Sequence, residues 1–412
     1  MARAMKDSGI AWIGVIPEEW IIERNKNCFS CGKEIVGNAS SDTQLLSLTT
    51  RGVIEKPNDS VGGKMPESFD TYQIVYPDNM VMCLFDLDCS AVFSGLSPFY
   101  GMISPAYKVL VCKNNVLPRY ADYWFSFVFQ DRKFKAYAKN LRYTLNYDEF
   151  AALPMVVPPR PKQRLITGFL DHKCAEIDAV IEQTRASIEE YKALKQSIIT
   201  EAVTKGIRGD RPMKDSGIAW IGEIAEDYGL QKLKYAAEIL DQFRSPITAD
   251  QRNQDAEVLY DYYGASGAID KIDGYTIDDH VMLIGEDGAN LRMRNLPLMY
   301  EVNGKAWINN HAHILKPKAN VDFYYLFYTL EALDINPYIT GSAQPKLSQE
   351  NLKNIWLPIP SIEEQYEIVE YLKCRISEIG ELVERKRAFL LELESYKKSV
   401  IYECVTGKKV IS

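Results

Sequence analysis

The sequence predicts an α+β fold in which two long antiparallel coiled-coil helices separate two α/β domains, with the halves related by a pseudo-two-fold internal repeat. Three observations predict it. The segment MKDSGIAWIG occurs unchanged at 5–14 and at 213–222. Residues 145–206 align with residues 347–408 at a constant offset of 202. The inserts between these repeats, roughly 21–144 and 228–346, do not resemble each other, so a repeated scaffold carries two different inserts.

Each insert is predicted to be the body of an α/β domain. Short β-branched and aromatic runs alternate with Gly, Pro, Asn and Asp, which is typical of strands joined by turns. TYQIVY, MVMCLFDL and YKVLVC are such runs in the first insert, and HVMLIG is one in the second. Each insert ends in a predicted helix, YADYWFSFVFQDRKFKAYAKNL in the first and VDFYYLFYTLEAL in the second. The predicted domains span 1–160 and 207–360.

The repeated tails, 161–206 and 361–412, are predicted to be long helices, because they are rich in helix formers and carry an apolar seam at spacing 4,3. Both seams have polar interruptions at matching places, which favours antiparallel packing of the two helices on each other; two independent surface helices are the alternative. Antiparallel packing predicts the domains at opposite ends of a rod about 60 Å long. The first seam consists of Leu170, Cys174, Ile177, Ile181, Thr184, Ile188, Tyr191, Lys195, Ile198 and Ala202, and the second of Leu372, Ile376, Ile379, Val383, Lys386, Leu390, Leu393, Lys397, Val400 and Cys404.

Composition sets limits on the class of protein. The chain has 412 residues, of which 46% are hydrophobic and 25% charged, and no apolar run is long enough to suggest a membrane span. The N-terminal segment does not read as a secretory signal, and the eight scattered cysteines suit reduced thiols, so we expect a cytoplasmic protein. The net charge of −8 argues against an anionic partner, but residues 131–142 carry five basic groups against one acidic group.

Sequence motifs of the obvious enzyme classes are absent. The [ND]PP[YF] loop of adenine methyltransferases has its nearest match in Asn336-Pro337-Tyr338, which lacks one proline. The nearest match to the phosphate-binding motif GxxxxGK[ST] is Gly63-Lys64. It does not fit the motif, because Met65 follows and the upstream glycine is missing. GxSxG and HExxH do not occur. The sequence therefore predicts a non-catalytic protein, with an unusual methyltransferase or nuclease as the less favoured alternative.

A rigid spacer between two unlike domains suits the reading of a split DNA target, because readers of neighbouring half-sites lie one or more helical turns apart. A coiled-coil scaffold for protein partners is the other alternative. At this point the chain resembles the specificity subunits of type I restriction-modification enzymes over nearly its full length. The resemblance rests on KDSGIAWIGVIPEEW (6–20), YYGASGAID (262–270), LIGEDGAN (283–290) and, above all, GSAQPKLSQENLKNIWLPIP (341–360) followed by EEQ (363–365).

The resemblance implies two target recognition domains that read an asymmetric, bipartite target in double-stranded DNA. It also implies that the helices dock two methylation subunits and, through them, restriction subunits. Catalysis belongs to these partners, so no cofactor is expected in this chain: S-adenosylmethionine belongs to the methylation subunit, and ATP and Mg²⁺ serve the restriction subunit. The first half departs from the strongest motif, since NLRYTLNYDEFAALPMVVPP stands in its place.

Candidate DNA contacts in the second domain fall in its Gly-rich turns. Ser342, Gln344 and Lys346 precede a helix near Ser348, so they either contact DNA or belong to a helix cap. Further candidates are Asn290, Arg292 and Arg294, because Asn and Arg side chains can pair bidentately with base edges. In an extended chain they would share one face, and an ordinary exposed charged strand is the alternative. Lys271 is a candidate phosphate contact.

Candidate contacts in the first domain are basic. On a helix, Lys135, Lys139 and Arg142 would share one side, which suits a track of phosphates as well as an ordinary solvated face. Arg132 and Lys133 belong to the same run. A Gly/Pro/Asn-rich loop adds the three candidates Arg51, Lys56 and Lys64.

Trp12 and Trp220, in the exact repeat, are candidate anchors for two copies of one partner, or else they staple each domain to the helices. No metal site is expected. Cys28 and Cys31 have CxxC spacing without a second pair, and His311 and His313, on one face of a predicted strand, lack a third ligand, so ordinary packing is favoured for all four.

Overall fold

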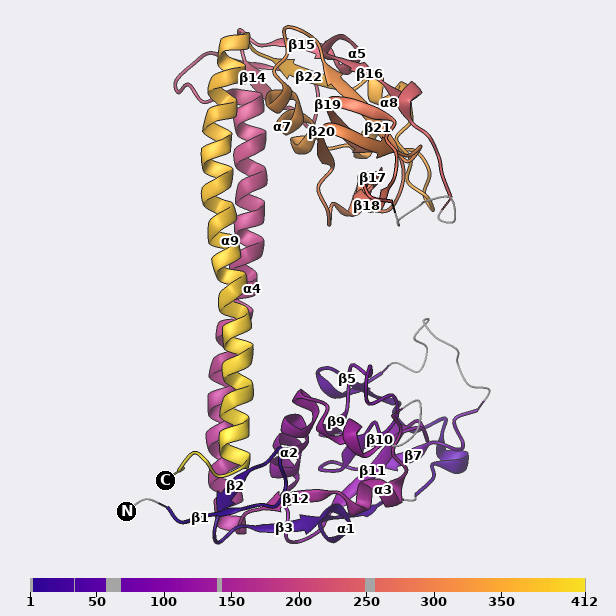
Figure 1. Ribbon diagram of the computed structural model, residues 1–412, viewed down its shortest axis with the longest axis vertical. Coiled ribbons are helices and arrows are strands. Elements are labelled where there is room, and N and C mark those ends of the chain that lie inside the picture. Colours follow the sequence, from indigo (N-terminus) through magenta and orange to yellow (C-terminus); the bar gives the residue numbers. More distant parts are fainter. Residues whose placement is uncertain (1–2, 33, 57–67, 139–142, 249–255, 412) are drawn as a thin grey trace. The chain divides into compact units, whose positions relative to one another are not determined.

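The computed structural model describes residues 3–32, 34–56, 68–138, 143–248 and 256–411. The chain forms two compact units (Figure 1). Unit 1 comprises 1–185 with 388–412, and unit 2 comprises 186–387. Each unit thus joins one insert to a segment of each long helix. The domain boundaries given above stay a prediction, because the units divide the chain within the long helices.

The two long helices are α4 (Arg160–Lys205) and α9 (Ile362–Val405). Each is followed by a glycine in the left-handed region, Gly206 at φ 78° and Gly407 at φ 73°. A side chain is excluded at both positions: a Cβ on Gly206 would lie 2.5 Å from the Tyr228 hydroxyl oxygen, and one on Gly407 2.4 Å from a Pro17 ring carbon. A glycine thus follows the end of each helix, at positions one residue apart in the repeat, since the offset of 202 aligns Gly206 with Lys408. No helix among the described residues is both long and apolar enough to cross a membrane.

In unit 1, the first part of α4 lies beside the last turns of α9 (Figure 1). The Lys397 ammonium donates to Asp178 at 2.6 Å, and Arg185 donates to Glu394 at 3.2 Å. Increasing residue numbers in α4 therefore meet decreasing numbers in α9. Leu170 and Cys174 of α4 share one buried core with Val400 and Cys404 of α9 (all seam positions).

Unit 2 has the complementary pairing. Val203, near the end of α4, packs in one core with Val369 and Leu372, near the start of α9. The Lys386 ammonium lies 5.6 Å from the centre of the Tyr191 ring. The segments again run in opposite directions, so the predicted antiparallel pairing is confirmed within each unit.

The polar interruptions of the seam are accommodated locally. Thr184 is buried, and its hydroxyl donates to the Val180 carbonyl one turn earlier at 2.7 Å. Lys386 and Lys397 have the partners just described, and Lys195 is exposed.

The paired strands of unit 1 are antiparallel and form one four-stranded sheet, β4-β11-β8-β9, and several two-stranded pairs. Its strands are β1 (Met5–Asp7), β2 (Val15–Pro17), β3 (Ile21–Arg24), β4 (Phe29–Cys31), β5 (Leu46–Thr49), β6 (Gly52–Glu55), β7 (Gln73–Val75), β8 (Met80–Met82), β9 (Ser94–Leu96), β10 (Gly101–Ile103), β11 (Lys108–Cys112) and β12 (Pro154–Val157). Its shorter helices are α1 (Asn25–Cys28), α2 (Pro118–Gln130) and α3 (Tyr147–Ala152), with 3-10 turns at Gly37–Ala39 and Lys133–Tyr137.

Unit 2 carries a six-stranded sheet in the order β16-β21-β19-β20-β17-β18, in which only the β17–β20 pair is parallel. These strands are β16 (Ala237–Ile239), β17 (Tyr260–Gly264), β18 (Gly267–Ile272), β19 (Ile277–Gly285), β20 (Met299–Ile308) and β21 (Ala312–Pro317). Two further pairs join β13 (Met213–Asp215) to β14 (Glu223–Ala225) and β15 (Gly229–Lys232) to β22 (Trp356–Ile359). The shorter helices are α5 (Leu233–Ala236), α6 (Asn290–Met293), α7 (Phe323–Ala332) and α8 (Gln349–Lys353), with 3-10 turns at Asp241–Phe243 and Asn336–Tyr338.

A fully buried glutamine fastens each insert to its long helix. In unit 1, Gln163 accepts from the backbone N–H of Leu117, which caps α2, and donates to the carbonyls of Asn115 and Pro158, all at 2.8 Å. In unit 2, Gln365 accepts from the N–H of Asp322, which caps α7, at 2.8 Å. It donates to the carbonyls of Asn320 and Pro360.

A buried tyrosine repeats the same pattern. The Tyr120 hydroxyl lies 3.0 Å from the Val156 carbonyl and 3.2 Å from that of Val405. The Tyr325 hydroxyl lies 2.8 Å and 3.1 Å from the carbonyls of Pro358 and Val203, their counterparts in the repeat. The repeated sequence thus builds one helical frame twice, and the α+β class with its internal repeat is confirmed.

Candidate nucleic-acid interface

Four loops of unit 2 meet at one place: the turn between β17 and β18, the loop after β19, the turn between β20 and β21, and the loop before α8. We call this set the loop cluster. The Glu286 N–H donates to the His311 carbonyl at 2.8 Å, and the Leu347 N–H donates to the Glu286 carbonyl at 2.7 Å. A Cβ on Gly285 would lie 2.8 Å from the Ala265 carbonyl oxygen, so only glycine permits this close approach. Gly285, one of the glycines quoted for the family resemblance, therefore allows two of these loops to pack together.

The loop before α8 is itself tight. Thr340 and Lys346 exchange backbone hydrogen bonds at 2.9 and 2.8 Å. Gly341 has φ 80°, and a Cβ there would lie 2.4 Å from the Gln344 carbonyl oxygen. Ser348 caps α8, its hydroxyl accepting from the Asn351 N–H at 3.2 Å, so the helix cap that the sequence offers as an alternative is present. The side chains of Ser342, Gln344 and Lys346 are left exposed on this loop.

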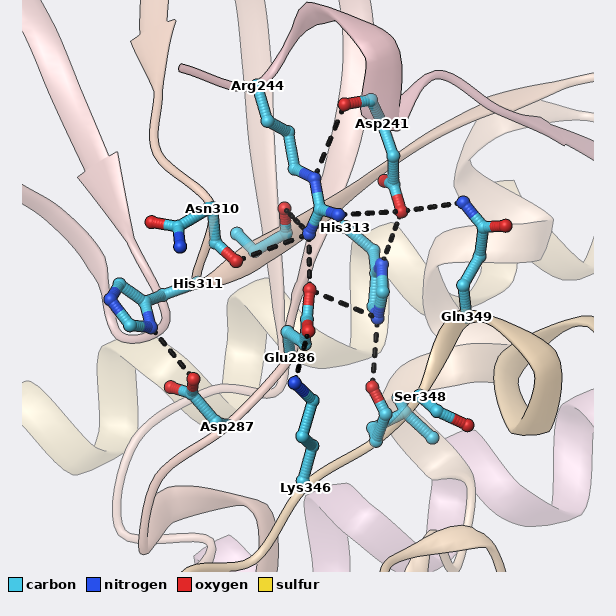
Figure 2. A network of polar contacts seen from close by, with 12 residues as sticks. Asp241, Arg244, Glu286, Asp287, Asn310, His311, His313, Lys346, Ser348 and Gln349 are labelled. Carbon is cyan, nitrogen blue, oxygen red and sulfur yellow. Dashed lines mark hydrogen bonds and ion pairs between the residues drawn. The ribbon is translucent and has the colours of Figure 1, made fainter. Parts of the chain in front are cut away.

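Beneath the loop lies a charged network of five residues, Asp241, Arg244, Glu286, His313 and Lys346 (Figure 2). Asp241 accepts from His313 Nδ1 at 2.7 Å and from the Gln349 amide at 2.9 Å. Glu286 accepts from Arg244 and, at 3.0 Å, from the Lys346 ammonium. The network ties the loop before α8 to β19, β21 and the Asp241–Phe243 turn.

Both carboxyl groups are held in their ionised form. Burial raises the pKa of Asp241, but hydrogen bonds from His313, Gln349 and the Ile314 N–H outweigh it, so the pKa lies below its ordinary value. Burial likewise raises the pKa of Glu286, and hydrogen bonds from Arg244 and Lys346 outweigh it. His313 Nε2 lies 2.9 Å from the Leu347 carbonyl oxygen. A carboxylate oxygen and a carbonyl oxygen thus face the two ring nitrogens of His313.

Asn290, Arg292 and Arg294 lie beside this cluster but not on an extended strand. The prediction of an extended chain is wrong, because Asn290–Met293 forms the short helix α6 and Arg294 has φ 51°. The Asn290 side chain closes this turn by bonding the backbones of Leu296 and Pro297. Arg294 donates to the Glu331 and Leu333 carbonyls.

Arg292 alone of these three is exposed and turned to the loop before α8, donating to the Gly341 carbonyl at 3.1 Å. Lys271 lies on β18, where its ammonium binds Asp261 of β17 at 3.0 Å. The structure therefore brings together Arg292, Ser342, Gln344 and Lys346, and their role as DNA contacts stays a prediction.

The basic run of the first insert is not a continuous helix, so that prediction is wrong. α2 ends at Gln130, because Arg132 takes a left-handed φ of 48° and its guanidinium donates to the carbonyls of Leu87 and Ser90 at 2.8 and 3.1 Å. Lys133 binds Asp131 and lies over a Phe ring, and Lys135 lies 4.2 Å from the Tyr143 ring. The described part of the run therefore supports unit 1 internally; Lys139 and Arg142 lie outside the described residues.

We expect Arg132→Ala to lower the free energy of unfolding of unit 1 by about 2 kcal/mol, because two carbonyls and the face of Phe129 lose a charged partner. The salt dependence of DNA binding should not change. Denaturant titration and binding at several salt concentrations measure both. Arg51→Ala, at an exposed position, is the stability control, and a shallower salt dependence in the Arg132 variant would instead make that residue a phosphate contact.

Arg51 occupies the turn between β5 and β6, where it lines a cleft of about 530 Å³ with Thr49, Ser97, Arg119 and Asp122 among others. It is exposed, and no described residue bonds its guanidinium. Lys56 is partly buried directly after β6, and Lys64 lies outside the described residues. In unit 1, the candidate Arg51 thus lies at the edge of this cleft.

Trp12 and Trp220 pack into their own units. The Trp12 indole N–H donates to the Tyr137 hydroxyl at 3.1 Å, and its ring lies 5.9 Å from those of Trp124 and Phe127. Trp220 packs against the cores that hold α7 and the long helices. This geometry favours the staple over the partner anchor, and partner binding by these residues stays a prediction.

Sequence reasoning missed the network and an exposed histidine. His311 lies in the turn before β21, not on the strand with His313; its Nδ1 binds Asp287 at 2.8 Å, and half of its side chain is exposed. Apart from Asp241 and Arg244, which are three positions apart, the side-chain partners are 24 to 108 positions away, so no sequence pattern links them. All eight cysteines are free thiols, and within the described ranges no three His, Cys, Asp or Glu side chains are grouped to hold a metal ion.

Comparisons with known proteins agree with this architecture. Residues 231–394 match the family model described as type I restriction modification DNA specificity domain. A putative type I restriction enzyme specificity subunit of Haemophilus influenzae is 32% identical over 34% of this chain and 35% of its own length. The type I restriction enzyme MjaVIII specificity subunit of Methanocaldococcus jannaschii is 22% identical over 95% of this chain and 93% of its own.

A solved structure, described as the basis of complex assembly and conformational transition of the type I R-M system, shares the fold. It matches with a TM-score of 0.71 at 13% identity, covering 96% of this chain and 99% of that one. The family match falls on the loop cluster and α9, and the relatives extend it along the chain. Residues 231–394 thus match the DNA specificity domain of type I restriction-modification systems, and over nearly its full length the chain is similar to type I restriction enzyme specificity subunits.

Proposed function

We propose that each unit reads one half of an asymmetric, two-part target in double-stranded DNA, and that the paired segments of α4 and α9 fix the gap between the halves. One observation carries this proposal: the same helical frame, with the same buried Gln and Tyr bonds, is built twice around two unlike inserts. Because the frame is repeated, each insert is held on the paired helices in the same way. Because the inserts differ in sequence, each presents different side chains to DNA. Two different half-sites at one fixed spacing follow from that combination.

The loop cluster supports the assignment for unit 2. Rigid loops with exposed amide, hydroxyl and cationic groups supply the donors and acceptors that base edges and phosphates require. Gln344 is the natural base-edge contact, since an amide pairs bidentately with adenine, and Lys346 the natural phosphate contact. In unit 1 the corresponding surface is the cleft beside Arg51.

The pseudo-two-fold repeat supports two equivalent docking places for a methylation subunit, because the outward helix faces occur twice. Restriction subunits join through that complex. S-adenosylmethionine, ATP and Mg²⁺ then act in the partner subunits. No base chemistry or DNA cleavage is assigned to this chain.

The test is a selection from random duplex DNA by the complex of this chain with its methylation subunit. Bound or methylated molecules should contain two fixed blocks of different sequence, separated by a constant number of unspecified base pairs. The methylation subunit without this chain is the control and should enrich nothing. A complex that assembles but enriches no sequence would instead identify the chain as a protein scaffold.

A further inference from the structure

The charged network under the loop cluster contains four members whose side chains are largely shielded from solvent and one exposed member (Figure 2). The exposed fractions of the side chains are 1% for His313, 8% for Asp241, 14% for Glu286 and 19% for Arg244, against 53% for Lys346. Within these four, Arg244 binds both carboxylates, and His313 Nδ1 binds Asp241. Both carboxylates therefore keep a partner without Lys346, whose ammonium lies at the surface.

Glu286 keeps a partner when Lys346 leaves it. The Lys346 ammonium binds Glu286 Oε1, whereas Arg244 binds Oε2, and His313 Nε2 lies 3.9 Å from Oε2. When Lys346 leaves, the Glu286 carboxylate is therefore not left without a partner, which would be energetically costly at a shielded position.

The loop also keeps its shape when the Lys346 side chain moves. The backbone bonds between Thr340 and Lys346 remain, as do those from Leu347 to Glu286 and from Gly288 to Pro345. The ammonium is thus free to change partner while its Cα stays in place.

We propose that Glu286 is a specificity-determining residue: it holds Lys346 away from DNA during sequence-independent binding and releases it to a phosphate only when the loop cluster docks on its half-site. The inference rests on the proposed function. In a loose encounter, water and salt screen the phosphate, and the ion pair with Glu286 persists. In a docked interface from which water is excluded, the phosphate competes successfully for the ammonium.

The two variants that test this are Glu286→Gln and Lys346→Ala, each measured in the complex with the methylation subunit, on the selected duplex and on a random duplex. Glu286→Gln removes the competing charge and keeps an acceptor for Arg244. It should raise affinity for random duplex about threefold to tenfold and steepen the slope of log affinity against log salt by about 0.9. In the double variant with Lys346→Ala, this gain should disappear.

Lys346→Ala alone gives a second test that does not depend on the folding of the Glu286 variant. It should weaken binding to the selected duplex and lower its salt slope by about 0.9, and leave random-duplex affinity unchanged. Asp279→Asn is the matched control: it also removes one negative charge from unit 2 and frees an exposed lysine, Lys316, that is not in the loop cluster.

A gain with Glu286→Gln that survives Lys346→Ala, or that Asp279→Asn reproduces, would overturn the inference. So would an equal loss on both duplexes with Lys346→Ala. If the wild-type complex does not distinguish the selected duplex from random duplex, the proposed function itself fails. If it does and the variants have no effect, only this inference fails.

Discussion

A seven-residue insertion into each long helix should lengthen the gap between the half-sites by about three base pairs and leave both half-sites unchanged. Seven residues add about 10.5 Å to a helix, and one base pair occupies about 3.4 Å. The insertions belong between Ala186 and Ser187 in α4 and between Ala388 and Phe389 in α9, positions related by the repeat. A whole heptad returns the apolar seam to nearly the same face, so the pairing within each unit is retained.

The measurement is the selection from random DNA, repeated with the lengthened chain. Affinity should fall, because three base pairs turn the grooves by roughly a third of a helical turn while a heptad barely rotates the helices. A heptad inserted into α4 alone is the control, since it lengthens one helix without its partner and should prevent a functional complex. A lengthened chain that selects the original gap would show that the helices do not set the spacing.

Gln365→Leu should lower the free energy of unfolding of unit 2 by about 3 kcal/mol. The side chain is fully buried, and its loss leaves the Asp322 N–H and the Pro360 carbonyl without their partner. Each buried polar group left unpaired costs about 1–3 kcal/mol. Gln163→Leu should have the same effect on unit 1, because it removes the equivalent three bonds.

Chemical denaturation measures both changes, and hydrogen exchange locates them. Faster exchange should appear at the start of α7 for the Gln365 variant and at the start of α2 for the Gln163 variant. Gln183→Leu, at an exposed position of α4, is the control and should change stability by less than about 0.5 kcal/mol. Equal stability of all three variants would mean that these glutamines do not hold the inserts to the helices.

The helical frame was predictable because its sequence occurs twice in the chain. An offset of 202 aligns Gln163 with Gln365 and places both helix seams, and antiparallel pairing in each unit confirms the prediction drawn from the matched interruptions. The first seam is buried from Leu170 to Ile188, is exposed at Lys195 and is buried again at Ala202. Apolar periodicity is a local property of the sequence, so it is readable without a structure.

The local structure around the candidate site was not predictable in the same way, because distant residues decide it. Arg132 leaves the helix to bond Leu87 and Ser90, more than 40 positions earlier. Composition and spacing carry no trace of such partners.

The charged network is the extreme case. Asp241, Glu286, His313 and Lys346 come from four separate elements, and each taken alone is an ordinary polar residue. The glycine-rich turns of the sequence did indicate the loops of the loop cluster. The ion pair of Lys346 with Glu286, however, forms only in the folded unit. The candidate contacts that the structure groups are therefore those on the loop before α8 with Arg292, whereas the basic run of unit 1 is largely engaged in its own fold.

The most direct measurement is a base-resolved footprint of the assembled complex on its selected duplex, for the wild-type chain and for a chain altered in the loop before α8 at Gln344. The account predicts two protected blocks of different sequence, of which the substitution weakens only one. A single continuous block, or equal weakening of both blocks by a change confined to unit 2, would contradict it.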